Sequence, residues 1–369
     1  MDIHAYLNQC VEKLLEANGQ DLFLKVGAVP RTRIGGVVTP LAMEPMRDET
    51  TRLMAKTYLH ERQLEGLEKN HSVDFAFSLP GSTRRFRGNL FMQQGHYSAV
   101  IRTLWKNIPT LEELGIPPVL KTAALERSGI ILIGGTVASG KTTTLHAMIE
   151  AMNQSVPRHI VTIEDPVEYL HEDKQCIINQ REVGEDTRDF TSAMKYIVRQ
   201  SPDVVVIGEM RDAETFQMAI ASAEVGRLVM ATVHAKSVVQ IFDRVLGFFP
   251  PAERDGVLSQ LYPNITCFCV QKLLTARDGY SLVPAFEVMI GNYMIRQLVH
   301  ERKFDKIPQA LRNCAHEGMQ TMDQALLQLC RQEKISMETA LAASERPQEL
   351  ENIMRGIEID GQTGKILGG

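Results

Sequence analysis

Residues 134–144 read GGTVASGKTTT, and the apolar run IILI comes directly before them at 130–133. The stretch matches the spacing G-x-x-x-x-G-K-[ST] at Gly135, Gly140, Lys141 and Thr142. An apolar β-branched run before the match and a helix-forming run after it supply the strand–loop–helix context that the motif requires. The sequence therefore predicts a phosphate-binding loop; an ordinary glycine-rich turn is the alternative.

The residue types of this loop suit a phosphate ligand. Glycines let the backbone turn so that its N–H groups point at phosphate oxygens, and the following helix adds the positive end of its dipole. We expect Lys141 to reach the β- and γ-phosphates and the hydroxyl of Thr142 to ligate Mg²⁺. The predicted nucleotide contacts are Gly135, Thr136, Ala138, Ser139, Gly140, Lys141, Thr142 and Thr143.

Composition limits the class of protein. The chain has 369 residues, of which 44% are hydrophobic and 23% charged, and such values are typical of a globular protein with more than one domain. The net charge of −5 argues against a protein that coats nucleic acid. No apolar run reaches the roughly 20 residues that span a bilayer, and the first residues lack signal-peptide features, so we expect a cytoplasmic location. The six cysteines include no C-x-x-C pair, which argues against zinc.

The first part of the chain, residues 1–107, reads as an α+β domain. Apolar residues recur at helical spacing at 3–17, and a second helix is predicted at 48–68. Residues 73–104 are rich in strand-forming residues. The segment 108–118, IPTLEELGIPP, contains three prolines and is interpreted as an interdomain linker.

From residue 119 to 284 the pattern changes. Apolar strands alternate with helical segments, which favours a parallel sheet covered by helices on both faces. The strands are predicted at 130–133, 159–163, 203–207 and 228–233. Residues 285–369 are expected to form a mainly helical C-terminal region.

An acid-rich segment follows the strand predicted at 159–163. Glu164, Asp165 and Glu168 should lie at the carboxyl end of that strand, where the ligand sites of α/β proteins form. Hydrolysis needs a carboxylate to orient the attacking water, and Mg²⁺ needs oxygen ligands. The segment could supply both, with Asp165 as a candidate metal ligand; a solvated acidic loop is the alternative.

Two later strands also end in polar residues. The run DVVVIGE ends at Glu209, which fits a Walker B acid that binds Mg²⁺ directly or through water, with a strand cap as the alternative. The run LVMATVH ends at His234, which could sense the γ-phosphate by a hydrogen bond. A single histidine at a strand end is more often structural, so both interpretations stay open.

Arginines of the first domain are candidates for a catalytic role. Arg85 and Arg87 share one face of a predicted strand, because side chains alternate along a strand, and Arg102 lies on the next strand. An arginine at the γ-phosphate can stabilise a transition state strongly. The pattern does not separate this role from that of a solvated basic face.

The order of these segments resembles the secretion-superfamily hexameric ATPases. GGTVASGKTTT is followed by TIEDPVEYLHEDKQCIINQREVG, RQSPDVVVIGEMRD and ATVHAKS. Within that superfamily, INQREVG and the later GMQTMDQ at 318–324 resemble the PilT/PilU type IV pilus retraction ATPases. The resemblance implies an α/β fold: an N-terminal PAS-like α+β domain, a RecA-like P-loop NTPase domain and a mainly helical C-terminal tail.

The resemblance also implies roles for the candidate residues. Glu164, Asp165 and Glu168 fall in the family's Asp box, with Glu168 at the position of the catalytic glutamate. Glu209 falls at the Walker B acid and His234 at the end of the His box. Arg85, Arg87 and Arg102 fall where the N-terminal domain supplies arginines. ATP and Mg²⁺ would bind between the two domains of a subunit, with Thr142, Glu209 and Asp165 as the expected metal-site residues.

The implied function is that of a homohexameric ATPase motor that drives pilus retraction, pilin disassembly and twitching motility. The motor would be peripheral to the membrane, at the cytoplasmic face of the inner membrane, and would act on a PilC-like platform protein. A paralogous retraction ATPase is a further expected partner, and nucleic acid is not.

The chain departs from the family pattern in three places. The family's His box ordinarily begins with Gly-His, but here the chain reads Gly226-Arg227, and the retraction motif A-I-R-N-L-I reads MIRQLV at 294–299. The alternative function is therefore an accessory subunit that binds nucleotide, hydrolyses it weakly and supports a principal motor. Pro263 also interrupts LYPNITCFCVQKLL, a stretch that the resemblance implies is helical.

Overall fold

The chain forms two compact units. The first contains Met1–Ile108 with the segments Ile163–Glu172 and Gln180–Ser192, and the second contains Pro109–Thr162, Asp173–Asn179 and Ala193–Gly369. The computed structural model describes residues 2–17, 19, 21–34, 37–81, 84–104 and 107–355, and two short strands at 358–359 and 366–367.

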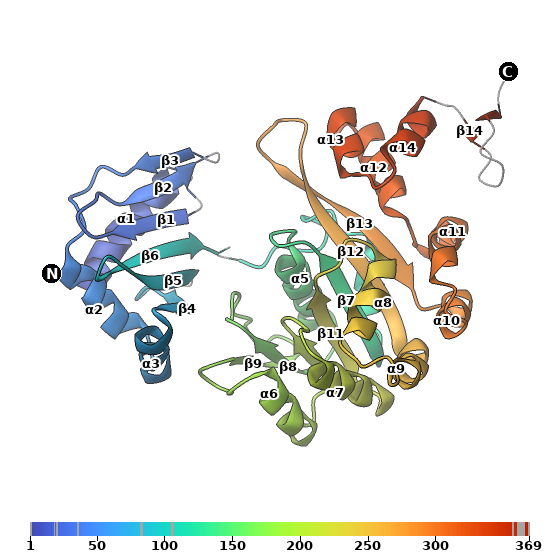
Figure 1. Cartoon of the computed structure of the whole chain (residues 1–369), viewed down its shortest axis with the longest axis horizontal. Helices are drawn as coiled ribbons and strands as arrows, with labels where there is room; N and C mark the ends of the chain where they lie inside the picture. The colour runs from blue at the N-terminus through green and yellow to red at the C-terminus, as the bar shows by residue number, and fades with distance from the viewer. Residues whose placement is uncertain are drawn as a thin grey trace. The chain divides into compact units, whose positions relative to one another are not determined.

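The first unit is built on a six-stranded sheet of order β3-β2-β1-β6-β5-β4, in which every neighbouring pair is antiparallel (Figure 1). Its strands are β1 (Asp21–Lys25), β2 (Arg31–Ile34), β3 (Val37–Pro40), β4 (Ser72–Ser78), β5 (Arg85–Gln93) and β6 (His96–Thr103). Its helices are α1 (Ile3–Glu16), α2 (Asp48–Tyr58) and α3 (Glu61–Asn70). Leu7 and Leu14 of α1 share one buried core with Leu22, Phe75 and Phe86 of the sheet, so the expected α+β domain is present.

The single helix predicted at 48–68 is wrong, because two helices occupy this stretch. Leu59 has an extended backbone and ends α2. His60 begins α3 as its N-cap in a capping box, in which the backbone N–H of His60 donates to Oε1 of Gln63 at 3.0 Å. This local pairing satisfies helix-end donors and starts a new helix, an effect that apolar spacing does not reveal.

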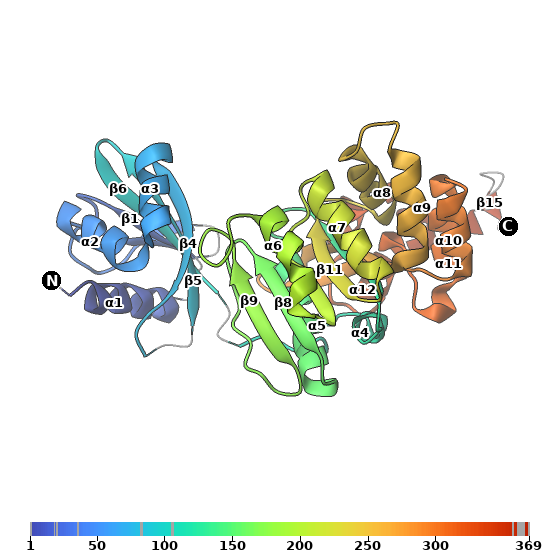
Figure 2. The same cartoon turned by 90° about the horizontal axis from the view of Figure 1, so that it is seen from below.

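A seven-stranded sheet of order β13-β12-β7-β11-β10-β8-β9 lies mostly in the second unit (Figure 1), and Figure 2 shows its strands β8, β9 and β11 from below. Its strands are β7 (Gly129–Gly135), β8 (His159–Glu164), β9 (Ile177–Glu182), β10 (Val204–Ile207), β11 (Leu228–Val233), β12 (Ile265–Thr275) and β13 (Leu282–Ile290). The pairs β12–β7, β7–β11 and β11–β10 are parallel, and β13 runs antiparallel to β12. The predicted α/β fold class is confirmed.

Helices cover both faces of this sheet and continue to the end of the described chain. They are α4 (Pro118–Ala124), α5 (Lys141–Ser155), α6 (Phe190–Ile197), α7 (Ala213–Glu224), α8 (Val238–Gly247), α9 (Arg254–Leu261), α10 (Tyr293–His300), α11 (Ile307–Asn313), α12 (Met322–Arg331), α13 (Met337–Ala343) and α14 (Pro347–Met354). Four 3-10 turns also occur in the described chain, at Val198–Gln200, Tyr262–Asn264, Phe304–Lys306 and Ala315–Glu317, and two short strands are β14 (Glu358–Ile359) and β15 (Ile366–Leu367).

Strand alternation assigns the two faces. Ile131 and Ile133 of β7 belong to the core that includes Leu145 and Met148 of α5. On β12, Phe268 alternates with residues of that core and packs against Phe242 of α8, with ring centroids 5.3 Å apart. The continuous apolar runs of the central strands are therefore buried on both sides, as in other parallel sheets.

Two expectations about the second half of the chain are corrected. The stretch LYPNITCFCVQKLL, expected to be helical, forms the end of α9 and a 3-10 turn at Tyr262–Asn264, and then becomes the strand β12. Its β-branched and aromatic residues favour a strand. The expected helical region after residue 285 begins later, since β13 extends to Ile290 and α10 is the first helix after it.

Within the described residues, no helix combines the length and the apolar character that a membrane crossing requires.

Candidate nucleotide site

The phosphate loop connects β7 to α5 in the second unit. Every residue of β7 is buried, and the strand ends at Gly135. Gly140 is the N-cap of α5 and has φ = 85°, the left-handed region in which a side chain is strained. The start of α5 leaves backbone N–H groups without partners inside the helix, and such groups are donors that suit an anion.

Close packing explains why glycines occupy two positions of this loop. A Cβ atom on Gly135 would lie 2.3 Å from Oγ of Ser139 and 2.7 Å from the carbonyl oxygen of Gln271. A Cβ atom on Gly140 would lie 2.8 Å from Nε2 of Gln271. These separations are too short for a side chain, so the backbone of the loop can approach its neighbours and a phosphate closely.

Lys141 is folded onto the loop. Its side chain is buried, and Nζ donates to the carbonyl oxygens of Gly135 at 3.1 Å and Thr136 at 2.7 Å. Burial lowers the pKa of Lys141, and the negative charge of Glu209 opposes that shift. Nearby, Oγ of Ser139 is buried and has no hydrogen-bond partner within the described chain. The loop thus contains a desolvated ammonium group and an unpaired hydroxyl, both of which fit phosphate oxygens.

The carboxylate of Glu209 follows β10, whose four residues are all buried. It accepts from Nη2 of Arg211 at 2.8 Å and lies 3.0 Å from Nε2 of His234. Burial acts to raise the pKa of Glu209, but the hydrogen bond and charge of Arg211 and the charges of His234 and Lys141 outweigh it, so the pKa is lowered. Glu209 is therefore kept as an anion among cations.

Hydrogen bonds between β10 and β11 bring His234 to Glu209. Oγ1 of Thr232 donates to the carbonyl oxygen of Gly208 at 2.5 Å, and the backbone N–H of Met210 donates to the carbonyl oxygen of Thr232 at 3.0 Å. These bonds extend the parallel pairing past the last paired residues of the two strands. Glu209 and His234 therefore lie together past the ends of β10 and β11, and Lys141 begins the helix α5 that follows β7, the next strand of the same sheet.

Arg227 lies at the other end of β11 from His234. It directly precedes the strand, which runs from Leu228 to Val233, whereas His234 directly follows it. Seven residue steps of about 3.3 Å each separate the two positions by roughly 23 Å. Arg227 therefore cannot contact the same nucleotide as the His234 of its own chain.

The acid-rich segment at 163–172 is held by β9 within the first unit. Glu164 is buried, and its Oε1 accepts from Nε2 of Gln180 at 3.0 Å. Nε2 of Gln180 also donates to the carbonyl oxygen of Tyr169 at 2.7 Å. Two residues further along β9, Oε2 of Glu182 accepts from the backbone N–H of Val167 at 3.0 Å. The segment is therefore an anchored loop, and the alternative of a freely solvated acidic loop is not what the structure shows.

Each predicted arginine of the first unit has a carboxylate partner. Arg85 donates through Nη2 to Glu182 at 3.2 Å and through Nε to the carbonyl oxygen of Val167 at 3.1 Å. Arg87 donates through Nη1 to Oε1 of Glu168 at 3.2 Å. Arg102, the cross-strand partner of Arg87, donates through Nε to Oδ1 of the buried Asp21 at 2.8 Å.

Glu182 and Asp21 are residues that sequence reasoning missed. Burial raises the pKa of Glu182, although the N–H of Val167 and the charge of Arg85 lower it. Glu182 lies inside the INQREVG stretch, so that motif was a usable signal. Asp21 opens the strand β1 and is joined by Nε of Arg33 at 3.4 Å, and no sequence pattern marks it.

The remaining metal-site candidates lie on different units. Thr142 is half-buried at the start of α5 in the second unit, and Asp165 follows β8 in the first. Among the described residues, no cluster of three or more His, Cys, Asp or Glu side chains could hold a metal ion. A P-loop site asks for no such cluster, because Mg²⁺ there is held by one hydroxyl, phosphate oxygens and water.

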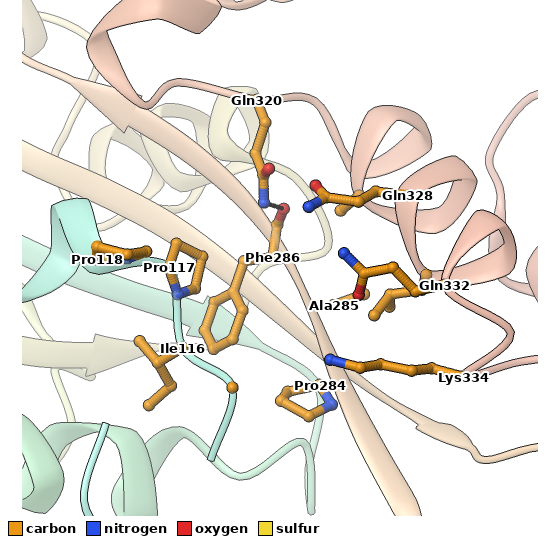
Figure 3. A pocket seen from close by; sticks show the side chains of 13 residues that line it. Ile116, Pro117, Pro118, Pro284, Ala285, Phe286, Gln320, Gln328, Gln332 and Lys334 are labelled. Carbon is orange, nitrogen blue, oxygen red and sulfur yellow. Dashed lines mark hydrogen bonds between the residues drawn. The ribbon is translucent and has the colours of Figure 1, made fainter. Parts of the chain in front are cut away.

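A separate pocket of about 310 Å³ lies elsewhere in the second unit (Figure 3). Gly115, Ile116, Pro117 and Pro118 form one wall. Figure 3 shows Gln328, Gln332 and Lys334 facing β13 from the helical region. None of the predicted site residues lines this pocket, so it is not the nucleotide site.

The profile of the family described as Type II/IV secretion system protein matches residues 2–355. The chain belongs to this family. The type IV pilus ATPase PilU of Pseudomonas aeruginosa is 38% identical over 354 residues, which are 95% of this chain and 92% of that protein. The type IV pilus retraction ATPase PilT of the same organism is 37% identical over 328 residues, which are 89% of this chain and 95% of PilT.

A solved structure supports the same assignment. The crystal structure of the pilus retraction motor PilT with bound ADP matches with a TM-score of 0.86 and 36% identity, over 95% of this chain and 99% of that chain. The predicted resemblance to PilT/PilU-type retraction ATPases is therefore confirmed. The present chain therefore has the fold of this family: an α+β domain, then a RecA-like domain, then a helical tail.

Proposed function

We propose that the protein is a hexameric motor that hydrolyses ATP and drives the retraction of type IV pili. The observation that carries the proposal is the Glu209–His234 pair, whose side chains lie 3.0 Å apart just past the ends of β10 and β11, and β11 is the neighbour of the phosphate-loop strand β7. The relatives named as type IV pilus ATPases supply the biological setting.

Nucleotide binding is assigned to the loop at 134–144. We infer that Lys141 exchanges the carbonyl oxygens of Gly135 and Thr136 for the β- and γ-phosphates, since an ammonium group gains more from an anion than from two neutral acceptors. The unpaired Oγ of Ser139 and the N-terminus of α5 add donors. The other proposed contacts are Thr136, Ala138, Thr142 and Thr143.

The residues fit a magnesium ion bound together with the nucleotide. Thr142 would ligate the ion directly, and Glu209 would hold it directly or through water, with Asp165 as a further candidate. When bound, Mg²⁺ neutralises charge on the phosphate oxygens. The lowered pKa of Glu209 keeps its carboxylate ionised for this role.

Hydrolysis is assigned to Glu168 as the residue that orients the attacking water. Water attacks the γ-phosphorus, the bond to the β–γ bridging oxygen breaks, and ADP and phosphate are formed. Glu164 is proposed to support the catalytic loop, and His234 to report the state of the γ-phosphate to Glu209. Arg85, Arg87 and Arg102 are proposed sources of positive charge. Arg87 has the more exposed side chain of the first two, at 43% against 17% for Arg85.

The proposed setting is the cytoplasmic face of the inner membrane, with a PilC-like platform protein as the partner. A homohexamer would turn closure of its nucleotide sites into movement of the platform. A paralogous retraction ATPase is a further proposed partner, and no nucleic-acid partner is proposed. The boundaries 1–107, 108–118, 119–284 and 285–369 remain predictions for the domains of this motor.

An accessory subunit with weak turnover is the second candidate. The observation that favours it is the altered segment 294–299 on α10, next to Tyr293, whose side chain is 84% exposed. Arg227, the other residue that motivates this candidate, lies at the end of β11 away from His234.

The test is the ATPase rate of the purified wild-type protein with Mg²⁺, measured beside Glu168→Gln. Clear wild-type turnover that is lost in the variant, with ATP binding retained, is the expected result. Arg52→Gln is the matched control, because it removes an exposed arginine whose partner is Asp48, far along the chain from the site residues. Background turnover in the wild-type protein would overturn the motor and favour the accessory subunit.

A further inference from the structure

The strand β12 carries a buried amide against the phosphate loop. Gln271 is 3% exposed and is the register partner of Gly135, the first glycine of the motif. Its Oε1 accepts from Oγ1 of Thr144 at 2.7 Å, across 127 residues of sequence. Thr144 lies in the first turn of α5 and is 1% exposed, so the hydrogen bond is shielded from water.

The amide nitrogen of Gln271 faces the second glycine of the loop. Nε2 lies 2.8 Å from the position that a Cβ atom on Gly140 would take, and the side chain of Leu273 lies 3.3 Å from the same position. The backbone of Gly140, with φ = 85°, is thus packed directly against β12. Gln271 contacts the loop at both glycines, through its main chain at Gly135 and its side chain at Gly140.

The surroundings make an amide unusual at this position. Cys267 and Cys269 lie on the same face of β12 by strand alternation, and both are fully buried in the core that contains Leu145 and Met148 of α5. An apolar side chain would continue that core, whereas a buried amide costs free energy unless it is hydrogen-bonded. Gln271 lies where this face of β12 reaches the phosphate loop, and there its amide accepts a hydrogen bond from the hydroxyl of Thr144.

We propose that Gln271 is a positioning residue for nucleotide binding, which acts through Thr144 and Gly140 to set the geometry of the phosphate loop. The inference rests on the proposed assignment of this loop to nucleotide. The backbone N–H of Thr144 donates to the carbonyl oxygen of Gly140 at 3.0 Å, which closes the first turn of α5. Holding both residues fixes the direction of the N–H groups of Lys141, Thr142 and Thr143 between them.

The experiment compares Gln271→Leu and Thr144→Val, which remove the hydrogen bond from either side while keeping the volume of the side chain. We would measure the Kd for ADP and for ATP with Mg²⁺, together with the Tm without nucleotide. Loss of one positioned hydrogen bond should weaken binding by roughly three- to tenfold in each variant. The double variant should bind no more weakly than the weaker single variant, because both changes remove the same interaction.

Two further variants separate positioning from general stability. Thr144→Ser keeps the hydroxyl and should restore nucleotide affinity. Ser222→Ala removes a buried hydrogen bond to the carbonyl oxygen of Met218 in α7, so it should lower the Tm without changing the Kd. If Gln271→Leu fails to fold, the comparison of Thr144→Val with Thr144→Ser still decides the question.

The outcomes distinguish this inference from the proposed function. If the wild-type protein binds no nucleotide, the proposed function fails. If the wild-type protein binds, Lys141→Ala does not, and both Gln271→Leu and Thr144→Val bind like the wild type, the role of Gln271 is overturned while the nucleotide site stands. A fall in Tm without a change in Kd would likewise reduce Gln271 to a structural residue.

Discussion

Nε2 of His234 lies 3.0 Å from Oε1 of Glu209, so the ends of β11 and β10 present an imidazole and a carboxylate to each other. Two further bonds between these strand ends, from Thr232 to Gly208 and from Met210 to Thr232, hold the pair in place. A change at either residue would therefore be felt by the other. In a nucleotide-hydrolysing site, this contact can pass the state of the phosphate to the acid.

Replacing His234 should reduce turnover more than binding. His234→Ala removes the imidazole that lies 3.0 Å from Glu209, and loss of a donor near developing charge costs roughly a hundredfold in kcat. The charge of His234 is one of the causes that lower the pKa of Glu209, so this pKa should rise in the variant. As the solution is acidified, the variant should therefore lose activity at a higher pH than the wild-type protein. The kcat, the ATP Kd and the pH profile of the rate would be measured. An unchanged kcat would remove His234 from the site.

Lys141→Ala should abolish nucleotide binding without unfolding the protein. The side chain of Lys141 is buried and burial lowers its pKa, so removal of this charge should cost little stability. Binding would be followed by calorimetry and folding by Tm. Lys121→Ala, which breaks an exposed pair with Glu112, is the matched control and should bind normally. Normal turnover in Lys141→Ala would refute the assignment of the phosphate loop.

Arg227→His should leave the ATPase rate unchanged. The substitution supplies the residue that the resemblance leads us to expect after Gly226, but the position lies before β11 and His234 lies after it. Rates would be compared for the two proteins under the same Mg²⁺ and ATP conditions. A large increase in turnover would show that Arg227 weakens the enzyme and would revive the accessory-subunit interpretation.

The buried carboxyl of Glu287 should make the stability of the protein depend on pH. It is 6% exposed on β13, and its Oε2 accepts from the N–H of Val238 at 2.8 Å. Burial raises its pKa from 4.5 to about 7, with the charges of Glu345 and Asp323 adding to the shift and Val238 and Lys272 opposing it. Since the folded-state pKa is the higher one, its contribution to stability is complete below pH 4.5 and is lost as the pH rises through about 7.

Glu287→Gln should flatten this dependence. The amide keeps an acceptor for the N–H of Val238 but does not ionise. The wild-type protein should lose roughly 3 kcal/mol of unfolding free energy as the carboxyl ionises, and the variant should not. Denaturant unfolding of both proteins between pH 5 and pH 8 is the measurement. Identical slopes of unfolding free energy against pH would contradict the assignment.

Much of the fold was predictable because its signals are local. The strands at 130–133 and 228–233 were recognisable as uninterrupted apolar runs, and such runs occur where a strand is buried on both faces. The break between α2 and α3 was not, because it depends on one capping pair, His60 and Gln63. The stretch after Pro263 was misjudged for a related reason, since a short apolar run fits either a helix or a strand until its neighbours are known.

Some residues of the candidate site were predictable from the sequence, and others were not. Lys141 was found from the glycine-rich motif, and Glu209 and His234 were found from their places at the ends of apolar runs. The sheet order brings the strands before these residues together. The partners of the arginines were not predictable. Asp21 and Arg102 are 81 residues apart and meet only through the register of β1 on β6.

By itself, the sequence determined the phosphate loop, the α/β fold class and the family, because these depend on residue types at fixed spacing along a continuous stretch. Only the tertiary structure decided that Gln271 meets Thr144, that Glu287 is buried beneath α8, and that Arg227 lies apart from His234. Such relationships follow from strand order, register and burial. These are set by the packing of the whole chain, and no local pattern encodes them.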